Sequence, residues 1–381
     1  MNIGFYAPLK SPDSEIPSGD RKMAKLLLKC LQCQGHNIRV MSHFKSRESQ
    51  GIREIQKDLK IQGEQISGKL IEDFSNIKNW QPDLWFTYHM FYKAPDLIGP
   101  KVSSTLKIPY VLAEASHAPK RADGPWSIFH NEVEKALAHA DLIIGVNSND
   151  RASVKQVIGI NTRYEELKPF LEINKMMNRE EERLLNRHAL YDKYKIPLHS
   201  VLLLSVGMMR EGAKFESYKI LANALARMDT KKEWNLVIIG DGPLRSKVES
   251  LFNKKIIFAG QLTSAQLQKY YSSADIFLWP AVNEAYGMAL LEAQSAGVPA
   301  VAGDSGGVKD ILRDKKTGLL SIEGDADDFA NKTCKLINNT NFRKKLSYNA
   351  LRITSRDHSF ESNSKKIGTW VLETREYFKR L

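Results

Sequence analysis

The sequence predicts an α/β protein built from two doubly wound domains, each with a parallel sheet covered by helices. Apolar runs of strand length alternate with helical patterns, and this alternation occurs twice along the chain. At 381 residues the chain is also too long for one ordinary hydrophobic core. Its 42% hydrophobic and 26% charged residues are typical of a soluble globular protein, and no apolar run approaches the ~20 residues that cross a bilayer.

Residues 1–170 are predicted to form the first domain. The expected strands are 2–6, 37–43, 83–89, 109–115 and 141–147, and the expected helices are 20–34, 51–78 and 125–140. A loop from Ala7 to Gly19 follows the first strand where a glycine-rich phosphate motif often stands. The backbone of Gly19 could approach a ligand there, and simple capping of the next helix by Ser18 or Asp20 is the alternative.

Residues 171–198 are predicted to connect the domains, and residues 199–355 to form the second one. The connection holds a charged helical segment over 179–195. The second domain is expected to contain strands 200–207, 235–240, 255–259, 275–279 and 299–302, with helices 215–228, 243–252, 264–274, 286–296 and 325–337. Residues 356–381 form a final amphipathic helix, with Phe360, Ile367, Trp370, Val371 and Tyr377 as its larger apolar residues.

A net charge of +12 and an isoelectric point near 9.3 favour anionic partners. Basic residues are scattered rather than interleaved with aromatics, so nucleic acid is not expected to bind. An anionic membrane surface or an anionic substrate is the alternative to a merely solvated basic surface. The lysines of helix 20–34 offer one such membrane-facing surface, although its pattern is also that of ordinary core packing.

The N-terminus enters a strand directly, without a leader pattern, which favours a cytoplasmic location, with peripheral contact at the inner membrane face as the alternative. Only three cysteines occur, too few for a disulfide framework. Cys30 and Cys33 have metal or redox spacing, but we expect them to pack within a helix.

The stretch from Asn283 to Gly297, NEAYGMALLEAQSAG, carries the strongest functional signal. Gly287 lies near the predicted helix start, where free N–H groups and the helix dipole suit a diphosphate. Glu284 and Glu292 flank this position and are good acceptors for sugar hydroxyls. Alternatively, the two carboxylates only complement the helix dipole.

The longer stretch NEAYGMALLEAQSAGVPAVAGDSGG resembles the donor-site signature of glycosyltransferase family 4, the retaining enzymes of the glycosyl transferases group 1. The resemblance implies the GT-B architecture: two Rossmann-like domains facing across a cleft, with the final helix crossing back onto the N-terminal domain. It also implies that the donor is a nucleotide-diphosphate sugar, in which the sugar is linked to uridine diphosphate or guanosine diphosphate. Glu284 would then hold the donor sugar, Glu292 the ribose hydroxyls, and the amides of Gly287 and Met288 the distal phosphate.

A second segment, SVGMMREGAK, supplies Arg210 and Lys214 at a strand-to-helix turn. In the family an arginine directly after the glycine and a later lysine neutralise the diphosphate. Here Met208 occupies the usual arginine position and Arg210 comes two residues later, so Lys214 matches the pattern better. Gly240 begins a Gly-Asp-Gly-Pro turn like the one the family places beside the nucleoside, and good turn chemistry alone explains it equally.

On the N-terminal side, His89, Glu114 and His117 lie at or just beyond the ends of two predicted strands. Ligands of open α/β sheets bind beyond the carboxyl ends of strands, so these residues are candidates for acceptor contacts or proton handling. No match identifies a general base. The resemblance implies front-face transfer, in which the leaving phosphate accepts the proton of the acceptor.

Neither a metal nor a separate cofactor is expected. Asp325 and Asp327 have a D-x-D spacing, but they open a predicted helix and are expected to cap it. The prediction is a metal-independent retaining glycosyltransferase of glycan biosynthesis that acts on a glycan, lipid-linked or small-molecule acceptor. A nucleotide-sugar epimerase of the same fold and a non-catalytic nucleotide-sugar-binding subunit are the alternatives.

Overall fold

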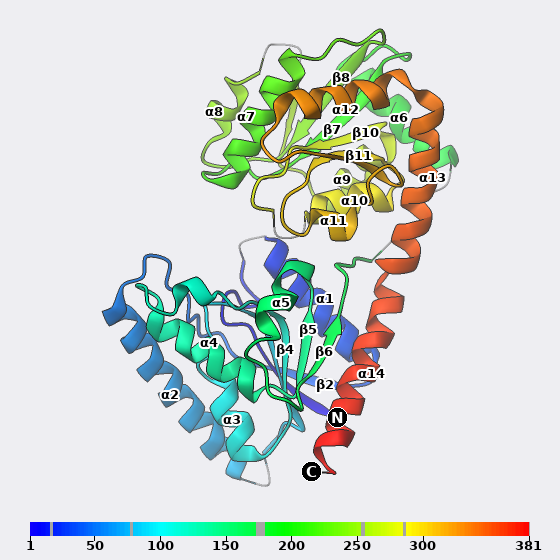
Figure 1. The fold of residues 1–381 in the computed structure, drawn as a ribbon. Helices are drawn as coiled ribbons and strands as arrows, with labels where there is room; N and C mark the ends of the chain where they lie inside the picture. Colours follow the sequence, from blue (N-terminus) through cyan, green and yellow to red (C-terminus); the bar gives the residue numbers. More distant parts are fainter. Residues whose placement is uncertain (16–17, 77–78, 173–179, 253–255, 285–286, 381) are drawn as a thin grey trace. The chain divides into compact units, whose positions relative to one another are not determined.

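The computed structural model describes residues 1–15, 18–76, 79–172, 180–252, 256–284 and 287–380. The chain forms two compact units (Figure 1). The first contains Met1–Leu167 together with Phe360–Leu381, and the second contains Lys168–Ser359.

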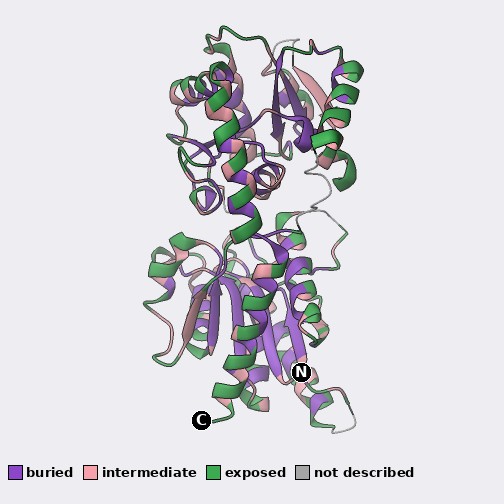
Figure 2. Ribbon diagram, turned by 90° about the vertical axis from the view of Figure 1, so that its right-hand side faces the viewer, coloured by how far each residue is buried: buried purple, intermediate pink, exposed green. Residues whose placement is uncertain are grey.

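Six parallel strands make the sheet of the first unit, in the order β2-β1-β3-β4-β5-β6. They are β1 (Asn2–Tyr6), β2 (Asn37–Ser42), β3 (Leu84–Met90), β4 (Tyr110–Ala115), β5 (Leu142–Gly145) and β6 (Arg163–Glu166). The apolar runs of β3, β4 and β5 are almost completely buried, as parallel sheets covered on both faces require, and Figure 2 shows this buried layer. The strand order reverses between β1 and β3, which makes their carboxyl ends the switch point of the sheet.

Helices of the first unit follow its strands. They are α1 (Gly19–Cys33), α2 (Arg53–Ser75), α3 (Gly99–Leu106), α4 (Ser127–His139), α5 (Arg151–Val154) and α14 (Phe360–Phe378), with short 3-10 turns η1 (Pro119–Arg121) and η2 (Ser148–Asp150). Ser18 caps α1 by accepting a hydrogen bond from the amide of Arg21 at 3.2 Å. Helix capping, which was one of the two interpretations of this loop, therefore occurs at Ser18.

The final helix, α14, packs on α1 and returns the chain to the first unit. Ser364 donates a hydrogen bond to the carbonyl of Cys30 at 3.2 Å, and a Cβ on Gly368 would lie 2.6 Å from the side chain of Gln34. Arg375 pairs with Asp83 at 2.6 Å. The predicted return of the last helix to the N-terminal domain is confirmed.

The sheet of the second unit also has six parallel strands, in the order β12-β11-β10-β7-β8-β9. They are β7 (Val201–Val206), β8 (Trp234–Ile239), β9 (Ile257–Gly260), β10 (Ile276–Trp279), β11 (Ala300–Gly303) and β12 (Gly318–Ser321). The helices are α6 (Glu180–Tyr194), α7 (Ala213–Ala226), α8 (Arg245–Glu249), α9 (Ser264–Ser273), α10 (Met288–Ser295), α11 (Val308–Ile311), α12 (Ala326–Asn338) and α13 (Thr340–Asp357). Here the order reverses between β7 and β10.

The doubly wound fold is as predicted, and the differences have local causes. The edge strand β6, with the polar sequence RYEE, and the short strand β12 were not predicted, because neither presents a long apolar run. Helices α3 and α13 were also not predicted. The helix expected over 243–252 is only five residues long, and α7 begins two residues earlier than expected.

The connection expected over 171–198 is partly built into the second unit. Its charged helix exists as α6 and packs against α9, and Arg187 pairs with Asp275 at 2.8 Å. Residues 173–179 of this segment lie outside the described residues.

Asp325 and Cys30 have the structural roles expected of them, whereas Cys33 is not packed against other residues as expected. Asp325 caps α12 by accepting hydrogen bonds from the amides of Asp327 and Asp328. Cys30 is buried in α1 and Cys33 is exposed, both as free thiols.

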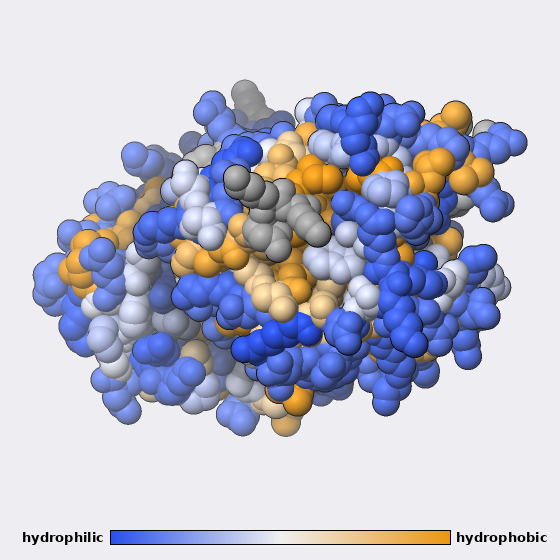
Figure 3. All heavy atoms as spheres, turned by 90° about the horizontal axis from the view of Figure 1, so that it is seen from above, coloured by the Kyte–Doolittle hydropathy of each residue, from blue (hydrophilic) through white to orange (hydrophobic). Residues whose placement is uncertain are grey.

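No helix among the described residues is long and apolar enough to span a membrane. Hydrophilic side chains cover most of the face drawn in Figure 3, with apolar groups in smaller patches.

Candidate functional site

The switch point of the second sheet brings the two predicted donor segments together. The loop after β7 leads into α7 and carries Arg210 and Lys214, while the loop after β10 leads into α10 and carries Glu284. Because β7 and β10 are neighbours, their carboxyl-terminal loops leave the same edge of the sheet side by side (Figure 1).

Glu284 and Lys214 are in direct contact across this edge. The ammonium group of Lys214 donates a hydrogen bond to Oε2 of Glu284 and lies 4.8 Å from the ring centroid of Trp279. Trp279 donates its indole N–H to the same carboxylate oxygen at 3.1 Å. The side chains of Lys214 and Glu284 are 23% and 14% exposed, so the pair is only partly hydrated and its charges interact strongly.

The backbone of Glu284 is held by the loop after β11. Gly307 donates its amide to the carbonyl of Glu284 at 3.1 Å, and Ser305 accepts a hydrogen bond from the amide of Glu284 at 3.4 Å. Gly306 has a φ of 57°, and a Cβ there would lie 1.9 Å from the Glu284 carbonyl oxygen. The Gly-Gly turn that follows the motif therefore allows this close approach.

Helix α10 begins beside Glu284. Gly287 precedes it with a φ of 75°, a left-handed conformation that favours glycine, and it has no side-chain cap. The first backbone bond of α10 runs from Leu290 to Gly287 at 2.8 Å, so the amides of Met288 and Ala289 have no intrahelical acceptor. Ala285 and Tyr286 of the motif lie outside the described residues, and the helix predicted from residue 286 is described from Met288.

Glu292 lies on α10 and accepts a hydrogen bond from the hydroxyl of Tyr271 at 3.0 Å. Burial, and then the neighbouring Glu292, raise the pKa of Tyr271 well above its ordinary value, so this hydroxyl stays protonated and donates. The carboxylate is thereby oriented by a buried partner.

The glycine-rich turns around Arg210 pack closely together. A Cβ on Gly240 would lie 1.9 Å from the carbonyl oxygen of Gly207, and Met209 exchanges backbone hydrogen bonds with Asp241 and Leu244. Gly240 thus has a structural reason to be glycine, which the turn interpretation expected. Arg210 is exposed on this loop, so its role at the phosphates stays a prediction.

The switch point of the first sheet gathers a different set of charges. Nδ1 of His89, at the end of β3, lies 3.1 Å from Oδ1 of Asp20 and 3.5 Å from Oε1 of Glu114. Asp20 stands in the first turn of α1 and Glu114 near the end of β4. His89 and Glu114 have φ values of 60° and 58°, a costly conformation for residues other than glycine, which often marks functional sites.

This cluster makes His89 cationic at neutral pH. Burial by itself would lower the pKa of His89, but Glu114 and Asp20 outweigh it and raise the pKa to about 9. Burial, with repulsion from Glu114, raises the pKa of nearby Asp150 to about 6. An imidazolium held by carboxylates is a hydrogen-bond donor rather than a base.

Glu114 lies near the end of β4 and His117 just beyond it, but the two residues belong to different clusters. His117 bonds to Glu134 and to the carbonyl of Ser153, whereas no contact joins it to His89 among the described residues. Gly19 is exposed at the start of α1, and a Cβ there would meet nothing within 4 Å. A ligand could therefore approach Gly19 without a clash. The space around this residue does not by itself require glycine.

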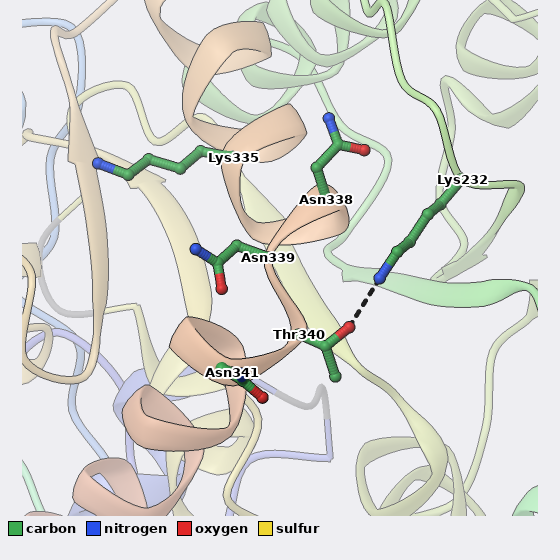
Figure 4. Close-up of a pocket in the computed structure, with 6 residues that line it drawn as sticks. All are labelled: Lys232, Lys335, Asn338, Asn339, Thr340 and Asn341. Carbon is green, nitrogen blue, oxygen red and sulfur yellow. Dashed lines mark hydrogen bonds between the residues drawn. The ribbon is translucent and has the colours of Figure 1, made fainter.

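A hollow of about 590 Å³ lies elsewhere in the second unit (Figure 4). It is lined by Lys232, Lys335, Asn338, Asn339, Thr340 and Asn341. Lys232 donates a hydrogen bond to Thr340 at 2.7 Å. The hollow shares no residue with either charged cluster.

Comparison with known proteins locates the family signal in the second unit. The model of the glycosyl transferases group 1 matches residues 188–352. Residues 188–352 belong to this family. The matched segment includes Lys214, Glu284 and Glu292.

One relative is a sulfoquinovosyl transferase of Arabidopsis thaliana, 33% identical over 144 residues, which are 37% of this chain and 28% of that protein. The chain therefore matches less than a third of the length of this relative. The sucrose-phosphate synthase from Thermosynechococcus elongatus has a similar structure over 100% of both chains, with a TM-score of 0.73 and 16% identity. A protein of Anabaena in complex with UDP-glucose has a TM-score of 0.71 and 15% identity, covering 98% of this chain and 100% of that one. These structures confirm the predicted GT-B fold.

Several residues of the two clusters were not predicted from the sequence. Trp279 ends an apolar strand and Tyr271 lies in a helix, so neither stands out by its neighbours. Asp150 lies beyond the carboxyl end of β5, while His89 and Glu114 lie at the carboxyl ends of β3 and β4, and this position was an available signal. Asp20 was predicted only as a cap.

Proposed function

We propose that the chain is a retaining glycosyltransferase that moves a sugar from a nucleotide-diphosphate sugar to a glycan, lipid-linked or small-molecule acceptor. The observation that supports this best is the contact of Lys214, Glu284 and Trp279 at the second switch point, with Glu292 about one turn into α10. These residues lie inside the matched family segment.

The donor would be bound by charge and hydroxyl contacts together. Sugar transfer leaves negative charge on the departing diphosphate, and Lys214 and the first amides of α10 would stabilise it. In the structure the charges of Lys214 and Glu284 neutralise each other. A bound donor would give each a new partner, diphosphate oxygens for Lys214 and sugar hydroxyls for Glu284. Glu292 would accept hydrogen bonds from the ribose.

The acceptor would be bound by the cluster of His89, Asp20 and Glu114. Because the pKa of His89 is about 9, its imidazolium would donate hydrogen bonds while the two carboxylates accept them. The acceptor proton would pass to the leaving phosphate, so the transfer needs neither a protein base nor a metal. The net charge of +12 supports a lipid-linked acceptor at an anionic membrane surface.

The test is to incubate the protein with uridine- and guanosine-diphosphate sugars and to follow the sugar by proton NMR. Release of nucleotide with the anomeric configuration of the donor retained in the first product supports the proposal. Conversion of the donor to its epimer without an acceptor would identify an epimerase instead. Binding of the donor with neither hydrolysis nor transfer to supplied acceptors would favour the non-catalytic alternative.

A further inference from the structure

A compact group of two histidines and one glutamate lies in the first unit, outside both switch-point clusters. His117 stands between β4 and η1, while His130 and Glu134 lie four residues apart on α4 and so share one face of that helix. One ligand atom from each of the three lies within 4.8 Å of the others. The family segment 188–352 does not include them.

The separations suit a metal ion bound by nitrogen and oxygen. Nε2 of His117 is 3.0 Å from Oε1 of Glu134, and Nδ1 of His130 is 3.9 Å from the same oxygen. The ligand atoms of a tetrahedral zinc ion lie roughly 3.3 Å apart, given Zn–N and Zn–O distances near 2 Å. The two measured separations fall on either side of this value.

The hydrogen bonds of His117 bring two lone pairs face to face, one on its Nε2 and one on a carboxylate oxygen of Glu134. Nδ1 of His117 lies 3.0 Å from the carbonyl oxygen of Ser153, and since a carbonyl can only accept, Nδ1 carries the proton of that contact. In the neutral ring Nε2 then presents a lone pair to a carboxylate oxygen 3.0 Å away. Two acceptors at this distance require either a second proton or a cation between them. Metal-binding histidines commonly have their other nitrogen fixed by a carbonyl in this way.

His130 adds an independent observation. Its side chain is 1% exposed, and neither ring nitrogen has a hydrogen-bond partner among the described residues. Leaving both nitrogens of a buried imidazole without partners is costly. A metal ion would satisfy Nδ1, which faces Glu134. The Glu134 side chain is 40% exposed and gives the ion a path from solvent.

We propose that His117, His130 and Glu134 form a zinc site, with water as the fourth ligand. Two imidazoles and a carboxylate are a donor set typical of zinc, whereas magnesium and calcium prefer oxygen ligands alone. The ion would tie the segment after β4 to α4, and His117 in this segment lies three residues beyond Glu114. The zinc site shares no residue with the proposed donor site. The proposal of sugar transfer therefore does not depend on zinc binding.

The experiment uses the full-length protein without a polyhistidine tag, stripped by a chelator and then titrated with zinc against a chromophoric competitor. We expect one equivalent to bind, with affinity reduced on the order of 100-fold in Glu134→Gln and His130→Ala, since losing even an outer partner of a metal ligand costs roughly 10- to 100-fold. Glu132→Gln, on the same helix, is the matched control and should bind like the parent. Binding that is equal in the parent and in both ligand variants would overturn the proposal.

Cobalt substitution identifies the ligands without any variant. A tetrahedral visible spectrum lacking a thiolate charge-transfer band supports a histidine and carboxylate site. An intense near-ultraviolet thiolate band would assign the metal to the free cysteines and overturn the proposal. Absence of metal binding, with His117 shown as an imidazolium by nitrogen NMR, would overturn the proposal, because a second proton would then occupy the contact with Glu134.

Discussion

The two units place charged clusters at equivalent positions but compose them differently. In each sheet the cluster lies where the strand order reverses, after β1 and β3 in the first unit and after β7 and β10 in the second. The second cluster pairs one lysine with one carboxylate beside a helix start, whereas the first surrounds one histidine with carboxylates. The second is suited to an anion with hydroxyls, and the first to a neutral or cationic polar group.

This difference follows from what each site must recognise in our proposal. A nucleotide-diphosphate sugar always presents a diphosphate and a ribose, so the second unit can use a fixed set of contacts. Acceptors share no such parts, and the first unit can vary its loops on the same scaffold. Variants at the two clusters should therefore have separable effects.

Lys214→Ala should reduce sugar transfer more than any other substitution at the two clusters. Removing the cation that would neutralise the leaving diphosphate should lower turnover at saturating donor by about 10²–10³-fold, the usual cost of losing one charge-stabilising donor. Lys219→Ala is the matched control, because Lys219 lies on the same helix and pairs with Glu216 at the surface. Unchanged turnover in Lys214→Ala, with rates measured by nucleotide release, would remove Lys214 from the site.

The cluster of His89, Asp20 and Glu114 should make the free energy of unfolding depend on pH. Because the pKa of His89 is raised from 6.5 to about 9, its stabilisation is complete below pH 6.5 and is lost as the pH rises through 9. The free energy of unfolding should fall by about 3 kcal/mol across this window. Asp150, with a pKa of about 6, titrates below the window.

Denaturant unfolding between pH 6.5 and 9.5 measures this effect. His89→Gln should flatten the dependence, while His188→Gln, at an exposed position of α6, should leave it unchanged. An identical pH dependence in His89→Gln and the parent would show that the carboxylates do not hold a proton on His89.

Glu292→Gln should weaken donor binding without abolishing it. A hydrogen bond to a charged group contributes about 1.5–3 kcal/mol, so the Kd for the donor should rise roughly 10- to 100-fold. Calorimetry with the nucleotide sugar and with the nucleotide monophosphate should show the same loss, because both carry the ribose. A loss of affinity for the nucleotide sugar alone would show that Glu292 does not bind the ribose.

Tyr271→Phe should have the smallest effect. It removes the hydroxyl that orients the Glu292 carboxylate but leaves that carboxylate able to accept hydrogen bonds from the ribose, so donor binding should weaken by only about 0.5–1.5 kcal/mol, a rise in Kd of roughly 3- to 10-fold. The double variant with Glu292→Gln should bind no more weakly than Glu292→Gln alone. Additive losses would indicate that the two residues act independently.

The sequence predicted the second cluster better than the first for a physical reason. Glu284 and Glu292 lie in one continuous segment, so the local sequence of a strand, a turn and a helix is enough to relate them. Lys214 was predicted from a second strand end. Its contact with Trp279 depends on β7 and β10 being neighbours, and an order of strands cannot be deduced from apolar runs.

The first cluster depends on three segments that are distant in the sequence. Asp20, His89 and Glu114 meet because β1, β3 and β4 are adjacent in the sheet, whereas His117, only three residues beyond Glu114, turns to α4 instead. Proximity along the chain grouped His117 with Glu114, but the path of the loop separated them. The strained backbone at His89 and Glu114 leaves no trace in composition or periodicity.

In our proposal the second switch point binds a nucleotide-diphosphate sugar. Thermal unfolding of the parent, Lys219→Ala and the double variant Lys214→Ala with Glu292→Gln, each with uridine-, guanosine- and adenosine-diphosphate sugars, tests it directly. We predict that sugars of one base raise the midpoint of the parent and of Lys219→Ala, and that the double variant loses most of this shift, because a ligand stabilises only the folded state that binds it. No shift with any nucleotide sugar, or an equal shift in the double variant, would contradict the claim.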